Sequence, residues 1–344
     1  MMRIDAQSGL RRFQVWLADD QGRAQRSFRL GASCGFAEAR EMLRDPDGRP
    51  DRLLVWTDAA SPPQSEDLNP PVPKVIKATG PMVALVDSGI NYRLEGLADR
   101  LARKDDGSLI GYDHWDQDDR PFDADFGRDP LFPVRHGTLV GHILVAEAPG
   151  SLLAPFRYPR PDMTRFADLV DDIAEAGIRI VAMPMGSNRA SDWQTFLDAA
   201  KRVPDILFVV SAGNDGRDIE TQPVWPAAAL LDNLIVVTSA DDFGRLAQGS
   251  NWGAVSVDIM VPGERVSTVD HRGVEVKASG SSFAVPRVAA LLARWLEADP
   301  ELNARDLRER LFARARPLRG PDAGKLRHGW VPDPTDDFIP AVGP

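Results

Sequence analysis

The sequence contains a single cysteine, Cys34, among 344 residues. One cysteine can form neither an internal disulfide nor a cysteine-rich zinc site. Long apolar runs are also missing. No stretch approaches the roughly 20 residues of a membrane-spanning helix, and no secretory signal follows residues 1–5. From these absences we expect a cytoplasmic protein that does not contact a membrane.

An excess of basic residues is absent as well. Lysine and arginine together number 41, against 51 aspartates and glutamates, which gives a net charge of −10. Because an acidic chain repels a phosphate backbone, nucleic acid is excluded as a general partner. With 43% hydrophobic and 27% charged residues the composition is that of a globular protein, and the length suggests about two domains.

Residues 1–62 have the pattern of a small α+β extension, which a proline-rich linker at 63–74 follows. The extension is predicted to contain strands at 13–17, 26–30 and 53–56 and a helix at 37–43. Two interpretations remain open for it. It is either a pro-domain that is removed, or a retained accessory unit that docks on the rest of the chain or on a dedicated protein partner.

From residue 75 to 335 short apolar runs alternate with helical periods, and residues 336–344 form a C-terminal tail. Strands are predicted at 82–86, 178–183, 206–210, 234–238 and 255–260, and helices at 164–176, 191–202 and 283–297. This alternation predicts an α/β fold, doubly wound, with a mainly parallel sheet covered by helices on both faces. Ligands of such sheets bind at the carboxyl ends of the strands.

Two residues are suited to acid–base chemistry, and one of them, Asp87, lies at such an end. Asp87 follows the predicted strand 82–86, and His136 precedes an apolar helical stretch. A histidine at the start of a helix tends to stay neutral, as a general base should. Each also has an ordinary structural interpretation, since aspartates cap turns and histidines often lie on the surface.

Two further residues suit acyl transfer. Asn214 lies in a loop of small residues after the strand 206–210, where its amide can face a developing oxyanion. Ser282 lies at the start of the predicted helix 283–297, with an exposed hydroxyl and a main-chain N–H that has no helical partner. A loop asparagine and an N-cap serine are common, so neither residue decides the question by itself.

Taken in order along the chain, the segments around Asp87, His136, Asn214 and Ser282 resemble those of the subtilisin-like serine proteases, or subtilases, of peptidase family S8. The resemblance spans about residues 75–335 and includes further matches at residues 111–113, 225–228, 250–253 and 261–263. It implies the subtilisin-like fold and a serine endopeptidase that acts on a peptide or protein substrate, with no cofactor.

The resemblance also implies a role for each matching residue. Ser282 would be the nucleophile, His136 the general base and Asp87 its orienting partner, while Asn214 and the Ser282 N–H would form the oxyanion hole. The family's substrate-binding positions correspond here to Pro184, Met185 and Gly186, which would pair with the substrate, and to Ser211, Ala212 and Gly213 at the first specificity pocket.

The sequence departs from the family at several positions. Leu139 replaces a second histidine, Arg135 replaces a glycine before the catalytic histidine, and Pro184 replaces a serine. These changes leave open an alternative: a subtilase-fold pseudoprotease that binds a peptide or partner without cutting it. The loop that holds the strong calcium site in bacterial subtilisins is missing after His142, so no metal site is predicted.

Six aspartates lie between residues 113 and 125, shortly before His136. Three interpretations of this run remain open: solvated surface, a weak calcium site, or an acidic rim that attracts basic residues of a substrate. Asp215, expected near the mouth of the specificity pocket, favours the last of these.

Overall fold

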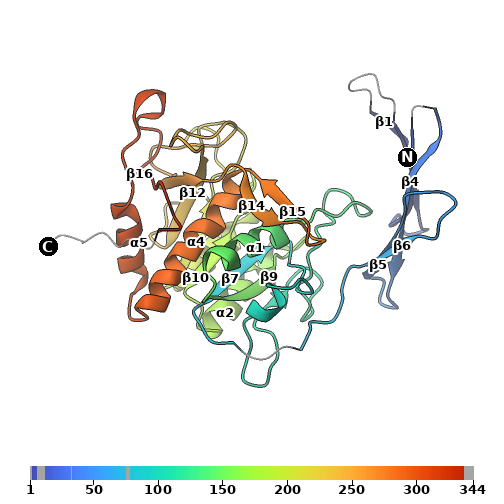
Figure 1. The fold of residues 1–344 in the computed structure, drawn as a ribbon, viewed down its shortest axis with the longest axis horizontal. Coiled ribbons are helices and arrows are strands. Elements are labelled where there is room, and N and C mark those ends of the chain that lie inside the picture. The colour runs from blue at the N-terminus through green and yellow to red at the C-terminus, as the bar shows by residue number, and fades with distance from the viewer. Residues whose placement is uncertain (1, 6–11, 32, 75–77, 337–344) are drawn as a thin grey trace. The chain divides into compact units, whose positions relative to one another are not determined.

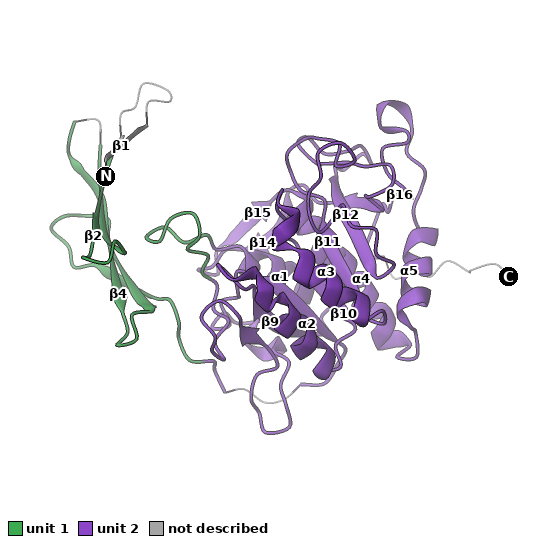
Figure 2. Ribbon diagram, turned by 180° about the vertical axis from the view of Figure 1, so that it is seen from behind, with its two compact units in different colours: residues 1–71, 124–134 green, residues 72–123, 135–344 purple. Residues whose placement is uncertain are grey.

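A computed structural model describes residues 2–5, 12–31, 33–74 and 78–336. The chain divides into two compact units. Unit 1 comprises Met1–Pro71 and Ala124–Val134, and unit 2 comprises Val72–Asp123 and Arg135–Pro344 (Figure 2). Of the predicted C-terminal tail, 336–344, all but Asp336 lies outside the described residues.

Unit 1 is built on an antiparallel sheet whose strands follow one another in chain order. The strands are β1 (Met2–Asp5), β2 (Arg12–Ala18), β3 (Ala24–Leu30), β4 (Phe36–Arg44), β5 (Pro50–Trp56) and β6 (Gln64–Asp67). The three predicted strands are confirmed as β2, β3 and β5. The predicted linker 63–74 contributes β6, so it is not only a connection between units.

The predicted helix at 37–43 is wrong, because this segment forms the strand β4. Its residues favour helix locally, but β4 has hydrogen-bonded neighbours on both sides, β3 and β5. Its charges are also paired across the sheet, with Glu41 2.6 Å from Arg26 and Glu38 3.5 Å from Arg29. Tertiary pairing overrides helix propensity here, and the described part of the extension is a β unit rather than an α+β unit.

One face of this sheet encloses a segment that comes from much later in the sequence. Met42, Leu53 and Leu68 form a buried cluster with Leu131, which is 0% exposed. Arg40 donates from Nη1 to the Leu131 carbonyl at 3.1 Å. The domain boundaries predicted from the sequence place residues 124–134 in the larger part, but their packing assigns them to unit 1.

Unit 2 contains an eight-stranded sheet in which every neighbouring pair is parallel, in the order β16-β13-β12-β11-β10-β7-β9-β8 (Figure 1). These strands are β7 (Met82–Asp87), β8 (Tyr112–Asp113), β9 (Leu152–Arg157), β10 (Ile180–Met183), β11 (Leu207–Ser211), β12 (Leu234–Ala240), β13 (Ile259–Pro262) and β16 (Gly329–Trp330). A hairpin of β14 (Val266–Val269) and β15 (Glu275–Ala278) lies apart from this sheet.

Helices cover both faces of the parallel sheet, as predicted. They are α1 (Gly137–Glu147), α2 (Phe166–Glu175), α3 (Gln194–Arg202), α4 (Ser281–Ala298) and α5 (Ala304–Ala313). Successive side chains of a strand point to opposite faces, and β7 shows the consequence. Val83 and Leu85 pack with α1 and α4, whereas Ala84 and Val86 belong to the cluster that contains α2 and α3.

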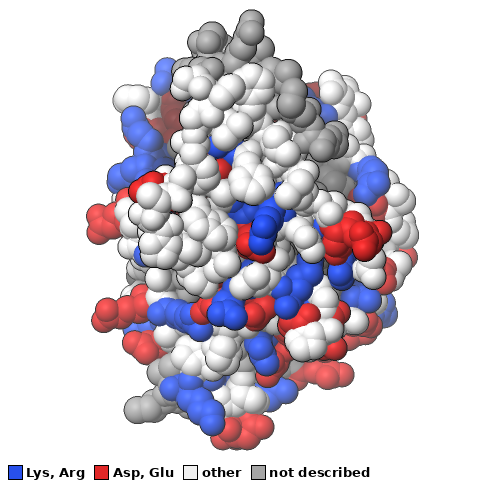
Figure 3. Space-filling view, turned by 90° about the vertical axis from the view of Figure 1, so that its right-hand side faces the viewer, with Lys and Arg blue, Asp and Glu red and all other residues white. Residues whose placement is uncertain are grey.

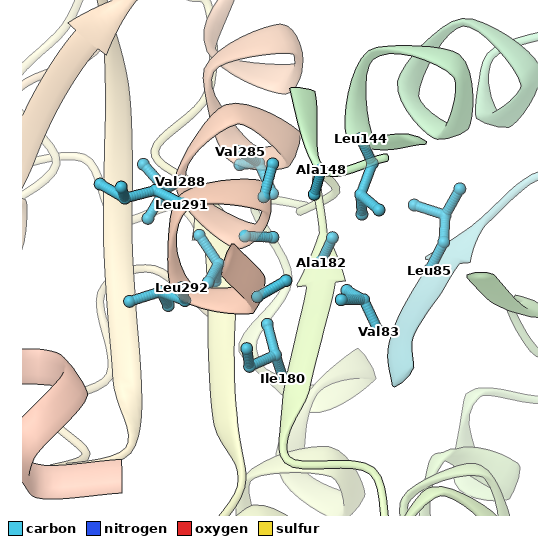
Figure 4. Packing of buried hydrophobic residues seen from close by; sticks show 14 of the residues in the cluster. Val83, Leu85, Leu144, Ala148, Ile180, Ala182, Val285, Val288, Leu291 and Leu292 are labelled. Carbon is cyan, nitrogen blue, oxygen red and sulfur yellow. The ribbon is translucent and has the colours of Figure 1, made fainter. Parts of the chain in front are cut away.

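Figure 4 shows the first of these layers, where side chains of β7 and β10 meet α4 and the end of α1. Val285 and Val288 of α4 are 0% exposed, as is Leu144 of α1. Each such side chain contributes roughly 1.5–3 kcal/mol when fully buried. The α1 and α4 helices are therefore held firmly against the sheet, and both begin at its carboxyl edge.

In the described part of the chain no helix is long and apolar enough to span a membrane. On the face of the molecule in Figure 3, basic and acidic side chains lie next to one another rather than in separate fields of one sign. The described residues visible in that view form no broad basic patch for a phosphate backbone.

The packing of Leu131 generates a stability prediction for unit 1. Leu131→Ala should destabilise this unit by about 2–5 kcal/mol, because it leaves a cavity in the cluster with Met42 and Leu53. Hydrogen exchange of the β4 and β5 amides in the full chain measures the effect. Val134→Ala, at a side chain that is 37% exposed, is the matched control. Unchanged exchange in Leu131→Ala would show that the segment is not part of the core.

Candidate active site

The four predicted catalytic residues lie at the carboxyl edge of the parallel sheet. Asp87 is the last residue of β7, and His136 immediately precedes α1. Asn214 follows the end of β11, and Ser282 is the second residue of α4. Because β7, β10 and β11 are parallel neighbours, their ends bring these segments to one edge.

Asp87 and His136 are in direct contact. Nδ1 of His136 lies 2.9 and 2.8 Å from the two carboxylate oxygens of Asp87. A carboxylate can only accept, so Nδ1 carries the proton and Nε2 is the basic nitrogen of the ring. The Asp87 side chain is 5% exposed and that of His136 is 28% exposed, so solvent reaches the base but hardly reaches its partner.

The approach of α1 to β7 requires a glycine next to His136. A Cβ at Gly137 would lie 2.0 Å from the Gly89 carbonyl oxygen and 3.1 Å from Cβ of Asp87. A side chain at this position would push the start of α1 away from the strand. Gly137 therefore sets the distance at which Asp87 and His136 meet.

Ser282 lies in the first turn of α4, close to the histidine. The ring of its neighbour Phe283 is 5.6 Å from the ring of His136, centroid to centroid. The Ser282 hydroxyl donates to the carbonyl of Pro184 at 3.3 Å. A turn of this hydroxyl away from Pro184 is needed before it can donate to a base, and catalytic hydrogen bonds are often loose until substrate is bound.

The orientation of the Asn214 amide follows from its partners. Its Oδ1 accepts from the main-chain N–H of Ser281 at 2.9 Å and from the Ser281 hydroxyl at 3.0 Å. Since an N–H can only donate, the atom facing it must be the oxygen. The Nδ2 group is then the side-chain donor that Asn214 can offer to a ligand beside the start of α4.

The predicted substrate-binding residues fall into two groups. Pro184 is buried, Met185 is half-buried and Gly186 is exposed in the stretch after β10. This stretch borders Ser282 through the Pro184 carbonyl. Because no substrate is present, pairing of a peptide with residues 184–186 stays a prediction.

Ser211 and Ala212 are buried at the end of β11, 4% and 0% exposed. The Ser211 hydroxyl contacts that of Ser281 at 2.7 Å and accepts from the N–H of Gly213 at 3.1 Å, so it joins β11 to α4. Gly213 has φ +98°, a conformation that favours glycine. The predicted pocket wall is therefore well ordered, and its contact with a substrate stays a prediction.

Sequence reasoning missed the residue that shapes the Asn214 loop. Asn251 is fully buried, and its Oδ1 accepts from the N–H groups of Asp215 and Arg217 at 2.9 and 3.1 Å. Its Nδ2 donates to the Ala212 carbonyl at 2.9 Å. Asn251 occurs in one of the segments that resemble the subtilases, but the sequence alone does not indicate which loop it contacts.

Asp215 is half-exposed and lies 3.3 Å from Arg217, so it already faces a cation of this chain. The role of Asp215 in attracting basic residues of a substrate stays a prediction, and Arg217 would compete with such residues for its carboxylate. The guanidinium of Arg217 also donates to Asn188, which ties this ion pair to the loop after β10.

The acidic run 113–125 is not uniformly solvated, as one interpretation assumed. Asp113 and Asp116 both pair with the buried Arg157, at 2.8 and 2.5 Å, and Asp123 is 0% exposed. Burial raises the pKa of Asp113 to about 6, although Arg157 opposes this. In the described residues no three His, Cys, Asp or Glu side chains are grouped so that they could hold a metal ion.

His114, next to Asp113, generates a prediction about pH. Burial lowers the pKa of His114 to about 4, and Arg165 adds to this, although the Asp172 carboxylate lies 3.3 Å from Nε2. The unfolded chain, with an ordinary pKa near 6.5, takes up the proton first. The contribution of His114 to stability is therefore complete above pH 6.5 and is lost as the pH falls toward 4.

We expect the free energy of unfolding of the wild type to fall more steeply between pH 6.5 and 4 than that of His114→Phe, by up to roughly 3 kcal/mol. Phenylalanine suits the site, because Tyr112 and Phe156 already contact the His114 ring. Chemical denaturation at several pH values measures this difference. Asp113 also titrates in this pH range, but it is present in both proteins, so the comparison isolates the effect of His114. Parallel pH curves for the two proteins would contradict the prediction.

Comparison with known proteins shows which family and which relatives this chain resembles. The model of the subtilase family matches residues 78–331. A thermophilic serine proteinase of Bacillus sp. (strain AK1) is 28% identical over 232 residues, which are 63% of this chain and 52% of that protein. The halolysin-like extracellular serine protease Nep of Natrialba magadii is 28% identical over 246 residues, 67% of this chain and 42% of that protein.

Among solved structures, a cold-adapted subtilisin-like serine proteinase superposes with a TM-score of 0.59 at 20% identity, covering 76% of this chain and 93% of that one. This likeness supports the fold that the sequence predicted. The chain spans about half the length of the curated relatives named above.

Proposed function

Because the chain belongs to the subtilase family, we propose that it is a serine endopeptidase that cleaves peptides or proteins through an acyl-enzyme intermediate. The observation that supports this best is the contact of His136 with both carboxylate oxygens of Asp87, at the edge of the sheet where α4 presents Ser282. An endopeptidase of this kind needs no cofactor.

In the proposed reaction the Ser282 oxygen attacks the carbonyl carbon of the scissile peptide bond. Nε2 of His136 takes the hydroxyl proton and then delivers it to the leaving amine. Asp87 holds the Nδ1 proton and stabilises the imidazolium that forms. A water molecule then attacks the acyl-enzyme, with His136 again as the base.

In this proposal two hydrogen-bond donors stabilise the negative charge that develops on the carbonyl oxygen. They are Nδ2 of Asn214 and the main-chain N–H of Ser282. The latter belongs to the first turn of α4, where N–H groups have no partner within the helix and the helix dipole favours negative charge. The Asn214 oxygen accepts from the N–H and the hydroxyl of Ser281, which leaves Nδ2 as the donating end of the amide. Both donors are thus oriented before substrate arrives, which is what makes such a site effective.

For the substrate we infer an extended peptide that pairs with residues 184–186. Gly186 supports this, because it is exposed and its neighbour Ser187 is held in place by reciprocal hydrogen bonds with Trp225, at 2.9 and 2.8 Å. A Cβ at Gly186 would lie 2.8 Å from the Trp225 carbonyl oxygen, so a side chain there would disturb the approach of this stretch to Trp225. Restriction to few substrates remains part of the proposal.

Labelling by a fluorophosphonate probe tests the activity. The wild type should react at Ser282, Ser282→Ala should not react, and Asn214→Ala should lose roughly 10²–10³ in kcat, the usual size for one oxyanion donor. Asp192→Asn, in a short turn after residues 184–186, is a control that should label like the wild type. Equal labelling of the wild type and Ser282→Ala, or no labelling of either, would favour the pseudoprotease alternative.

For unit 1 we infer retention rather than removal. Residues 124–134 come from within the larger part of the sequence, yet they complete the core of the N-terminal sheet. Arg29 and Arg40 lie over the ring of Phe132, at 3.6 and 4.1 Å from its centroid. Loss of the sheet would expose Leu131 and this ring to water. This packing favours the interpretation of the extension as a retained accessory unit over that of a pro-domain.

The mass of the purified chain during incubation decides between the two interpretations. We expect the intact mass to persist under conditions in which the probe labels Ser282. The loss of a fragment that ends within the linker 63–74 would establish self-processing and would contradict retention. The Ser282→Ala variant separates self-cleavage from cleavage by a contaminating protease.

A dedicated protein partner of unit 1 also remains a proposal. The side of the sheet that faces away from Leu131 carries Phe28, Ala39 and Trp56 on adjacent strands, and these line a shallow pocket together with the exposed Phe36. Apolar surface of this kind is what protein partners bury. If a partner binds there, Phe36→Glu should abolish its binding without changing the labelling of Ser282.

The cytoplasmic location expected from the sequence also stays a prediction. The extracellular location in the name of the Natrialba magadii protease belongs to that protein. Fractionation of cells that produce the full chain would decide where this one resides.

A further inference from the structure

One buried carboxylate at the site has no part in the proposed reaction. Asp123 is 0% exposed and lies in the loop before His136. From the sequence it is only one of the six aspartates of the acidic run. Its position under the start of α1, where Asp87 and His136 meet, makes it different from the others.

Both carboxylate oxygens of Asp123 accept hydrogen bonds from residues beside the proposed triad. Oδ1 accepts from the Ser88 hydroxyl at 2.6 Å. Oδ2 accepts from the N–H of Thr138 at 2.9 Å and from its hydroxyl at 2.5 Å. Ser88 follows Asp87 and Thr138 lies two residues after His136, so a single carboxylate joins the two segments.

The Ser88 hydroxyl has one proton and two carboxylates within reach. Its oxygen is 2.6 Å from Oδ1 of Asp123 but 3.2 Å from Oδ1 of Asp87. The shorter contact indicates that the proton points to Asp123. The same oxygen then accepts from the N–H groups of His136 and Gly137, at 3.2 and 2.9 Å.

These contacts replace the usual cap of α1. The N-cap residue His136 makes no side-chain cap hydrogen bond. Instead, Ser88 and Asp123 satisfy the N–H groups of Gly137 and Thr138. A negative charge at a helix N-terminus is also favourable with respect to the helix dipole.

Two basic side chains lie near Asp123. Arg135 donates from Nη1 to the main-chain carbonyl oxygen of Asp123, and Nδ1 of His271 is 3.9 Å from Oδ2 of Asp123. Burial by itself would raise the pKa of Asp123, but His271, Arg135 and the Ser88 hydroxyl together hold it below the ordinary value. The group is therefore a carboxylate at neutral pH and can accept all three bonds described above.

We propose that Asp123 is a positioning residue for Asp87 and His136. This proposal rests on the proposed protease function. Asp123 keeps the Ser88 proton away from Asp87 and holds the backbone of His136 and Gly137 through Ser88. In this way it preserves the full negative charge on Asp87 that stabilises the imidazolium, and it sets the place from which the His136 ring reaches Asp87.

Asp123→Asn tests the proposal with little change of shape. The asparagine amide meets two donors on Thr138 and one on Ser88, so its oxygen should face Thr138 and its NH2 group should face the Ser88 oxygen. The Ser88 proton must then turn to Asp87. This added hydrogen bond weakens the support that Asp87 gives to a protonated His136.

The first measurement is independent of catalysis. In the Ser282→Ala background, NMR titration of the His136 imidazole should show a lower midpoint in Asp123→Asn than in the parent. It should also show an altered Nδ1–H resonance. Asp119→Asn, at a side chain that is 86% exposed in the same loop, should match the parent. An unchanged midpoint and resonance in Asp123→Asn would overturn the proposal, whether or not the protein is a protease.

A second variant separates positioning from mere stability. Ser88→Ala removes the proton that Asp123 directs, so Asp123→Asn should shift the titration further only when Ser88 is present. A purely structural role would lower the thermal midpoint but leave the titration unchanged in both backgrounds. An equal shift with and without Ser88 would contradict the route through this hydroxyl.

With Ser282 intact, the labelling rate per folded molecule should fall about tenfold or more in Asp123→Asn, with the largest loss at low pH. KM for a peptide should be unchanged, since Asp123 does not face the substrate-binding residues. Failure of the wild type to label would count against the protease function, whereas the NMR result would still decide the role of Asp123.

Discussion

The close approach of α1 to the end of β7 is the constraint on which the site depends. At Gly137 there is no space for a side chain, because the Gly89 carbonyl and Cβ of Asp87 occupy it. The apolar layer between α1, α4 and the sheet supplies the force that presses the helix into this place. If α1 lay an ångström further away, the Nδ1 contacts of His136 at 2.8 and 2.9 Å would be lost.

Packing alone does not determine how the polar groups at this edge are arranged. Three buried side chains do so through directional bonds: Asp123 under α1, Asn251 under the Asn214 loop, and Ser211 between β11 and α4. Each satisfies main-chain or hydroxyl groups that would otherwise be costly to bury. The three sets of contacts make the Asp–His pair, the asparagine amide and the serine helix rigid before any substrate is present.

The sequence predicted the parts of the molecule in which local pattern and tertiary structure agree. The apolar strands, the amphipathic helix α2 and the segments that resemble the subtilases belong here. The strand β4 was missed because its helix-favouring residues are held by two neighbouring strands. Asp123 and Asn251 were missed for a related reason: their partners are distant in sequence, and nothing in a run of aspartates shows which one is buried.

The same limit applies to residues 124–134. In the sequence this segment is an ordinary connection before the catalytic histidine, but its apolar side chains enter the core of unit 1. Its ends are held together where Asp125 and Val134 exchange main-chain hydrogen bonds of 2.9 Å in both directions. Just outside these ends, Arg135 donates from Nη1 to the carbonyl of Asp123. The segment that enters the core of the N-terminal sheet therefore directly follows Asp123, for which we propose the positioning role. The retention proposed for unit 1 and the positioning role proposed for Asp123 therefore draw on adjoining stretches of the same chain.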